Sequence, residues 1–111
     1  MAKMNERYRE VCERLDWIVH EYSEDEMVEL EKYSPAGEDF IVSVELNGFI
    51  RNVKEYAAYF DTDEHVELWI GSRGKKGVPA RVRELVEDAE AIDEMLQELA
   101  AALAEVEVEE D

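Results

Sequence analysis

Carboxylates are the main side chains of this sequence that could do chemistry, and they concentrate near its end. Residues 84–111 contain twelve Asp and Glu and no Lys or Arg. The candidate partner-binding residues in this stretch are Glu84, Glu87, Asp88, Glu90, Asp93, Glu94 and Glu98. A helix of this length spans about 40 Å, so it carries roughly one carboxylate per 3.4 Å. One strand of duplex DNA carries a charge about every 3.4 Å. The pattern therefore indicates imitation of a phosphate backbone.

This charge pattern works against helix stability. Exposed helices usually alternate Glu with Lys one turn apart, which gains a few tenths of a kcal/mol per pair. Here Glu94 instead has Glu90 and Glu98 one turn away on either side, and like charges at that spacing cost a similar amount. The alternative is an acidic face that only keeps the protein soluble. The cost to the helix favours a functional role.

Two further acidic groups could extend the same partner-binding face. One is Glu24, Asp25 and Glu26, and the other is Asp61, Asp63, Glu64 and Glu67.

A basic segment over residues 71–83 is a weaker candidate. Its Gly74-Lys75-Lys76-Gly77 has the GxxG form of a KH-domain loop, although here it should follow a strand. Arg73, Lys75 and Lys76 could make a secondary contact, or the segment could be a flexible loop that pairs with the protein's own carboxylates. Trp69 is a candidate interface anchor if it lies exposed on a strand, and the alternative is that it packs under the first helix or the basic loop.

The sequence offers little for catalysis or metal binding. Cys12, His20 and His65 do not have the spacing of a metal site, and no Ser-His-Asp or Cys-His set stands out. The segment from Asp61 to His65 has oxygen ligands but lacks the glycine and the distal Glu of an EF-hand loop. We therefore expect no enzyme activity, no cofactor and no dedicated metal.

The elements that must position these residues follow from the apolar spacing. A first helix is predicted over 4–22, where apolar residues recur at steps of three and four. A last helix is predicted over 79–106, beginning near Pro79, with an apolar seam at the same steps. We expect these two long amphipathic helices to pack on each other through Leu15, Ile18, Ala89, Ile92 and Leu96.

Alternating apolar residues predict strands at 27–33, 39–46 and 66–70. The first two should be joined by a type I turn, because Ser34, Pro35 and Gly37 stand at the positions that turn favours. A short helix capped by Asn47 should follow them. The predicted order is α-β-β-α-β-α, an α+β fold with a three-stranded antiparallel sheet. Residues 1–106 form one domain in this prediction, and 107–111 form a frayed acidic tail.

Composition limits the possible partners and settings. The 111 residues contain 30 Asp and Glu against 12 Lys and Arg, a formal net charge of -18. Such a chain repels nucleic acid over most of its surface and attracts basic proteins. One cysteine excludes an internal disulfide, and no stretch reads as a signal peptide or a membrane span. We expect a cytoplasmic protein.

Several stretches of the sequence resemble a known group of proteins. These stretches are 33–40 (YSPAGEDF, the most specific of them), 53–57, 60–67 and 85–90. They are similar to small acidic proteins that phages and mobile elements of gut Firmicutes encode, over about residues 25–104. The resemblance brings no catalytic residues. It implies a setting in a bacterial host cell, where such proteins often inhibit host defence, as anti-CRISPR and anti-restriction proteins do.

Three functions remain open at this point. The first is an acidic inhibitor that mimics nucleic acid and binds the basic channel of a defence nuclease. The second is a non-catalytic interaction module that forms a homodimer. The third is a nucleic-acid binder that uses residues 71–83.

Overall fold

The computed structural model describes residues 3–22 and 24–110, which form helices and a small sheet. In chain order its elements are α1 (Glu6–Arg14), β1 (Ile18–Tyr22), β2 (Met27–Tyr33), β3 (Asp39–Glu45), α2 (Phe49–Tyr59), α3 (Thr62–Trp69), the 3-10 turn η1 (Ile70–Ser72) and α4 (Val82–Glu110). The α+β class and the three-stranded antiparallel sheet are confirmed. The predicted order of elements is wrong at two places.

The sheet is an antiparallel meander with the strand order β1-β2-β3. β2 and β3 occupy the segments predicted to be strands, and Leu30 pairs with Val42 at their centre. The turn between them has the predicted bond, in which the Gly37 N–H donates to the Ser34 carbonyl at 2.9 Å. β3 alternates buried with exposed side chains along its whole length, so one face of the sheet packs on the core and the other is open.

The first correction concerns residues 4–22, where the predicted long helix ends at Arg14. Asp16 adopts a left-handed conformation with φ 68°, which Asp tolerates better than most residues and which stops the helix. The next residue, Trp17, is 1 % exposed. Its ring meets Phe40 edge-on at 6.4 Å. Burying this ring turns the chain into β1, which supplies the third strand of the sheet.

The second correction concerns residues 66–70, which belong to α3 and η1 and not to a strand. Asp61 caps α3, because its side chain accepts hydrogen bonds from the N–H groups of Asp63 and Glu64. Val66 is buried, whereas Leu68 is 71 % exposed. The alternation of apolar residues therefore does not correspond to two faces of a sheet.

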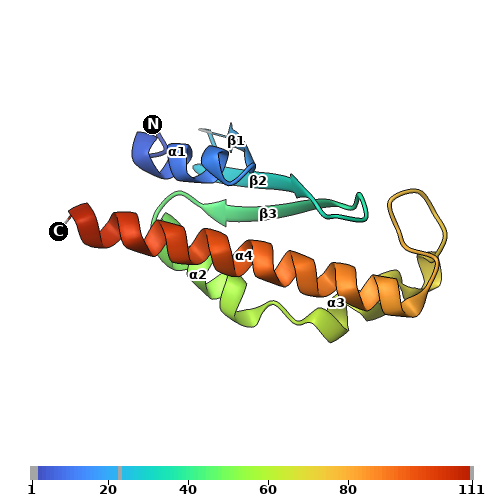
Figure 1. The fold of residues 1–111 in the computed structure, drawn as a ribbon. Helices are drawn as coiled ribbons and strands as arrows, with labels where there is room; N and C mark the ends of the chain where they lie inside the picture. The colour runs from blue at the N-terminus through green and yellow to red at the C-terminus, as the bar shows by residue number, and fades with distance from the viewer. Residues whose placement is uncertain (1–2, 23, 111) are drawn as a thin grey trace.

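α4 runs along the whole length of the molecule and forms the centre of the core (Figure 1). Its fully buried residues are Ile92, Leu96, Leu99 and Leu103, which pack with Trp17, Val28, Leu30 and Val53. Its first part contributes Leu85 and Ala89 to a second cluster around Val66. The helix therefore buries one continuous stripe, as its spacing predicted.

The contact expected between the end helices is present only in part. α1 does pack against α4, and Leu15 lies half-buried at the main core. Ile18 instead lies on β1 and is 48 % exposed, and Ala89 belongs to the second cluster. Only α4 is long, because α1 has nine residues.

Element ends differ slightly from the predicted ones. α2 is preceded by Gly48 with φ 74°, not by a capping Asn47 side chain. α4 begins at Val82, three residues after Pro79, and its backbone is helical through Glu110. Most of the segment predicted as a frayed tail, residues 107–111, is therefore helical here, and residue 111 lies outside the described residues.

Candidate functional site

An exposed row of carboxylates follows the outer side of α4. We call it the acidic stripe, and it consists of Glu84, Glu87, Glu90, Glu94, Glu98 and Glu105, all exposed. Their steps of three, four and seven residues place them on the side opposite the buried seam. Among the described residues, the four central members from Glu87 to Glu98 have no ion pair. Their charge is left for another molecule to neutralise.

Among the described residues, the ion pairs of α4 lie toward its ends. Arg81 lies 3.9 Å from Glu84, and Lys54 of α2 lies 3.4 Å from Glu107. Both pairs are well exposed, so each contributes little to stability. The middle of the stripe thus has no such pair among the described residues.

Asp88 was predicted to belong to this surface, and that prediction is corrected. It is 7 % exposed, and it accepts hydrogen bonds from the Ser34 hydroxyl at 2.7 Å and from the Ala36 N–H at 2.9 Å. The Ser34 oxygen in turn accepts from the Glu38 N–H at 3.0 Å. Asp88 therefore fastens the turn between β2 and β3 to α4 and is closed to a partner.

The burial of Asp88 lowers the charge density of the helix surface. Asp93 is also only half-exposed and accepts a hydrogen bond from Gln97 at 3.2 Å. From Glu84 to Glu105 the stripe has six carboxylates over roughly 32 Å, or about one per 5 to 6 Å. This spacing is wider than the spacing of one DNA strand.

α3 carries further exposed carboxylates, and its Val66 packs on Leu85 and Ala89 of the buried seam of α4. It packs against the first part of α4, and Asp63, Glu64 and Glu67 on it are exposed. Asp61, also predicted for this face, is exposed but engaged as the cap of α3.

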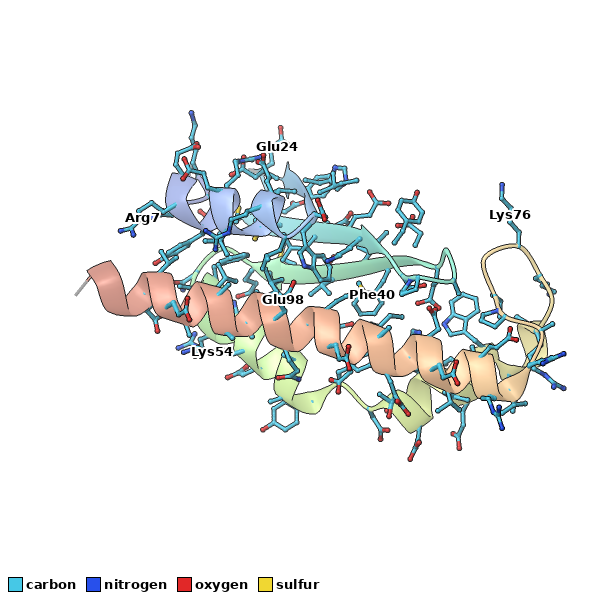
Figure 2. All side chains as sticks on the ribbon, viewed as in Figure 1. Arg7, Glu24, Phe40, Lys54, Lys76 and Glu98 are labelled. Carbon is cyan, nitrogen blue, oxygen red and sulfur yellow. The ribbon has the colours of Figure 1, made fainter. Side chains whose placement is uncertain are left out.

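The acidic turn between β1 and β2 lies apart from this surface. Glu24, Asp25 and Glu26 are exposed, as predicted. Figure 2 shows Glu24 at the top of the view near α1, well away from Glu98 on α4. The structure therefore does not join the turn to the acidic stripe, and a single flat partner surface could not cover both.

The basic segment forms an exposed loop at one end of the molecule. Arg73, Lys75 and Lys76 are exposed, and Figure 2 shows Lys76 at the end opposite the C-terminus. The loop touches the turn between β2 and β3, since a Cβ added to Gly77 would lie 3.1 Å from the Gly37 carbonyl oxygen. Only glycine at this position, with φ 80°, permits so close an approach.

Trp69 is not the exposed strand residue that the sequence predicted. It lies on α3, half-buried against the second cluster. Its ring is 6.4 Å from the imidazole of His65, whose Nε2 lies 2.9 Å from a Glu38 carboxylate oxygen. Trp69 therefore helps to hold α3 in place and offers little surface to a partner.

A groove beside the free edge of β3 was not predicted from the sequence. Its volume is about 720 Å³, and it is lined by residues of β3, α2, α3 and the link between the two helices, together with Met27 of β2. Its rings come from Phe40, Tyr56, Tyr59, Phe60 and His65, and its carboxylates from Glu45, Glu55, Asp61 and Glu64. No Lys or Arg is among its lining residues. We call it the β3-edge groove.

Three further titratable groups have shifted pKa values. Cys12 is fully buried, and burial raises the pKa of its thiol to about 12. On the open face of the sheet, a hydrogen bond to Asp39 and another to His20 lower the pKa of Glu31. The pKa of Asp39 is raised, chiefly by its hydrogen bond to Glu31. The hydrogen bond between the two carboxyls thus moves their pKa values in opposite directions.

Comparison with known proteins leaves these surfaces to be judged by their geometry. No family model, curated protein or solved structure matches the chain. Among residues 3–22 and 24–110, no helix is long and apolar enough to cross a membrane. Within the same residues, no three His, Cys, Asp or Glu side chains form a group that could hold a metal ion.

Proposed function

We propose that this protein is a non-catalytic inhibitor that mimics nucleic acid and occupies the basic nucleic-acid channel of another protein. The observation that carries the proposal is the acidic stripe, a row of exposed carboxylates on one face of a 29-residue helix. The buried seam of α4 packs on both core clusters, so the carboxylates project from a rigid element. A preorganised row of charges loses little entropy when it binds.

Lack of internal neutralisation supports this role. The central carboxylates of the stripe have no ion pair among the described residues, and the whole chain carries a net charge of -18. Such a negative field speeds the association of basic partners with this protein, and it repels nucleic acid. Direct binding to DNA or RNA is therefore not part of the proposed function.

The class of target rests on the resemblance of residues 33–40 and the other matching stretches to phage-type acidic proteins. On that basis we propose a CRISPR effector or a restriction enzyme as the target, in the cytoplasm of a bacterial host. Both classes of nuclease hold nucleic acid in positively charged channels.

The open face of the sheet favours a second function, that of a homodimeric interaction module. Ile18, Tyr22, Tyr33 and Ile41 lie on this face, and each is between 45 and 58 % exposed. A face with this much apolar surface is suited to a protein contact. The third proposal is a nucleic-acid binder that uses residues 71–83. It depends only on the exposed basic side chains of that loop.

Competition with DNA tests the first proposal directly. The protein is titrated into DNA-cleavage reactions of purified CRISPR effectors and restriction enzymes, and the inhibition constant is measured against rising DNA concentration. We expect at least one enzyme to be inhibited competitively with its DNA or guide RNA. Inhibition should weaken steeply between about 50 and 300 mM salt, because ions are released from both charged surfaces on contact.

Three outcomes would count against the proposal. Inhibition that does not change with salt or with DNA concentration would place the binding surface elsewhere. If no enzyme of either class is inhibited, the proposed target class is wrong. A chain that is dimeric in sedimentation and inhibits nothing favours the homodimeric module.

A further inference from the structure

We infer that the β3-edge groove binds an extended segment of a partner protein that carries Lys or Arg side chains, and that this segment adds a fourth strand beside β3. The inference rests on the groove alone and does not depend on the function proposed for the acidic stripe. Its grounds are the unpaired edge of β3, the exposed rings and the sign of the charge around them.

The unpaired edge follows from the register of the sheet. The Leu46 N–H donates to the Glu26 carbonyl, and the Ser34 N–H donates to the Glu38 carbonyl. In an antiparallel pair, hydrogen-bonded positions alternate with positions whose backbone groups point away from the partner strand. Val42 and Val44 therefore bond to β2, whereas Ile41 and Ser43 direct their N–H and C=O groups to the free edge.

Within the described residues, no group bonds to the outward-facing backbone of Ile41 or Ser43. At one end of the edge, the Asn52 side chain donates to the Glu45 carbonyl at 3.0 Å. An open row of this kind is a template for another strand. Ser43 also lines the groove, so a strand added here would lie within it.

The exposed side chains around the groove resemble a contact surface without its partner. Tyr59 is 84 % exposed and Leu68 is 71 % exposed, and both line the groove from the helices. Aromatic side chains supply much of the energy at protein contacts. They also attract the cations of Lys and Arg when these lie over the ring.

The charge around the groove selects the occupant. Glu45, Glu55, Asp61 and Glu64 line it, and no Lys or Arg does. A second copy pairing its own β3 here would bring the same carboxylates together, which disfavours a dimer. A partner with Lys or Arg on its strand would neutralise them.

The protein's own basic loop does not fit this site. Between Ser72 and Val78 the chain is folded into turns, in which the Lys75 N–H donates to the Ser72 carbonyl and the Val78 N–H donates to the Lys75 carbonyl. Gly74 and Gly77 have positive φ angles. A loop of this shape does not present an extended strand, so the occupant belongs to another protein.

A peptide of defined sequence tests the inference. The probe is a fluorescent heptapeptide in which Lys alternates with Val, and the control probe has Glu in place of Lys. Binding is followed by fluorescence anisotropy and by the amide NMR signals of the full chain. We expect the Lys probe to bind and to shift the amides of Ile41 and Ser43 most strongly, and the Glu probe not to bind.

Two further probes test for strand pairing. One probe is N-methylated at its Val residues and the other at its Lys residues. Because the N–H groups of alternate residues point to opposite edges of a strand, each probe has one edge blocked. We expect one of the two to bind about tenfold more weakly, since its amides can no longer pair with β3. Equal binding of both methylated probes and the unmodified probe would overturn the strand addition.

Paired protein variants locate the site. Tyr59→Ala and the double variant Glu55→Gln, Glu64→Gln should each weaken the Lys probe several-fold. Their controls are Tyr33→Ala, which removes an exposed ring from outside the groove, and Glu6→Gln, Glu10→Gln on α1. Equal weakening by the controls, or amide shifts confined to α4, would show that the peptide binds only through general charge attraction. If Ile41 and Ser43 shift with protein concentration alone, the occupant is a second copy and the inference fails.

Discussion

The acidic stripe and the β3-edge groove are both negative, but they differ in what surrounds the charge. The stripe is a row of carboxylates on the exposed side of a single helix. The groove places its carboxylates among exposed rings and next to an unpaired strand edge. The stripe can recognise only charge and its spacing, whereas the groove can also recognise a backbone and a side-chain shape. We therefore expect the stripe to respond to salt and to charge reversal, and the groove to respond to single side-chain truncations.

Reversal of the stripe should have the largest effect. Changing Glu90, Glu94 and Glu98 to Lys places like charges against a basic channel, which costs several kcal/mol in total, so we expect inhibition to fall by about 100-fold or more. The matched control changes Glu6, Glu10 and Glu24 to Lys, which alters the net charge by the same amount at exposed residues outside the stripe. Inhibition constants of both variants are compared, with thermal melts to check folding. Equal losses in both would show that net charge acts, and not the stripe.

Asp88 provides the next largest effect, on stability instead of binding. Asp88→Ala removes the acceptor of two hydrogen bonds and leaves the Ser34 hydroxyl and the Ala36 N–H without that partner. We expect the free energy of unfolding to fall by about 1–3 kcal/mol. Inhibition at a temperature where the variant is folded should stay unchanged, because Asp88 is closed to a partner. A stable variant that no longer inhibits would return Asp88 to the binding surface.

These two variants also show how far the sequence could predict the structure. The spacing of α4 placed Glu90, Glu94 and Glu98 on its outer side, because a long helix with a buried seam leaves little choice of face. The same spacing also placed Asp88 outside, at the boundary of the seam. Its burial depends on Ser34, which is 54 residues away in the sequence. No local period contains that information.

The errors at 4–22 and 66–70 have a related cause. In each segment, few apolar residues fit one period and exclude the other. The helix pattern and the strand pattern therefore overlap there. At 4–22 the deciding residue is Trp17, which is fully buried beneath the sheet and lies off the helical stripe. At 66–70 the deciding signal is Asp61 followed by Glu64, a capping pattern that starts a helix. That local signal was present in the sequence, whereas the burial of Trp17 requires the rest of the fold.

The β3-edge groove could not be predicted from the sequence, for a different reason. Its lining comes mainly from β3, α2 and α3, and the free edge exists only because β1 pairs on the far side of β2. The predicted strand at 66–70 could have covered this edge. Once that segment proves to be α3, the edge is open and its rings are exposed.

A smaller effect should separate the two surfaces by their salt dependence. Raising salt from about 50 to 300 mM should weaken inhibition by the stripe steeply, because it depends on released ions alone. Binding of the alternating Lys and Val probe to the groove should weaken less, since backbone hydrogen bonds and apolar contacts are little affected by screening. Both constants are measured in the same buffers. A groove that loses as much affinity as the stripe would show that it too recognises only charge.

The smallest effect is expected from Glu94→Lys alone, and it should be a gain. Glu94 lies one helical turn from both Glu90 and Glu98, so the change converts two like-charged pairs into two opposite pairs. Each conversion removes a cost of a few tenths of a kcal/mol and adds a similar gain, so the free energy of unfolding should rise by about 0.5–1.5 kcal/mol. Inhibition should fall only several-fold, since the remaining carboxylates of the stripe still face the channel. Chemical denaturation at low and high salt measures the free energy of unfolding, and its rise should shrink as salt screens the pairs.

The control is Glu10→Lys on α1, because Glu10 does not have an acidic residue four positions away on both sides. A loss of stability in Glu94→Lys, with no change in Glu10→Lys, would mean that the stripe does not repel itself and that its charge costs the fold nothing.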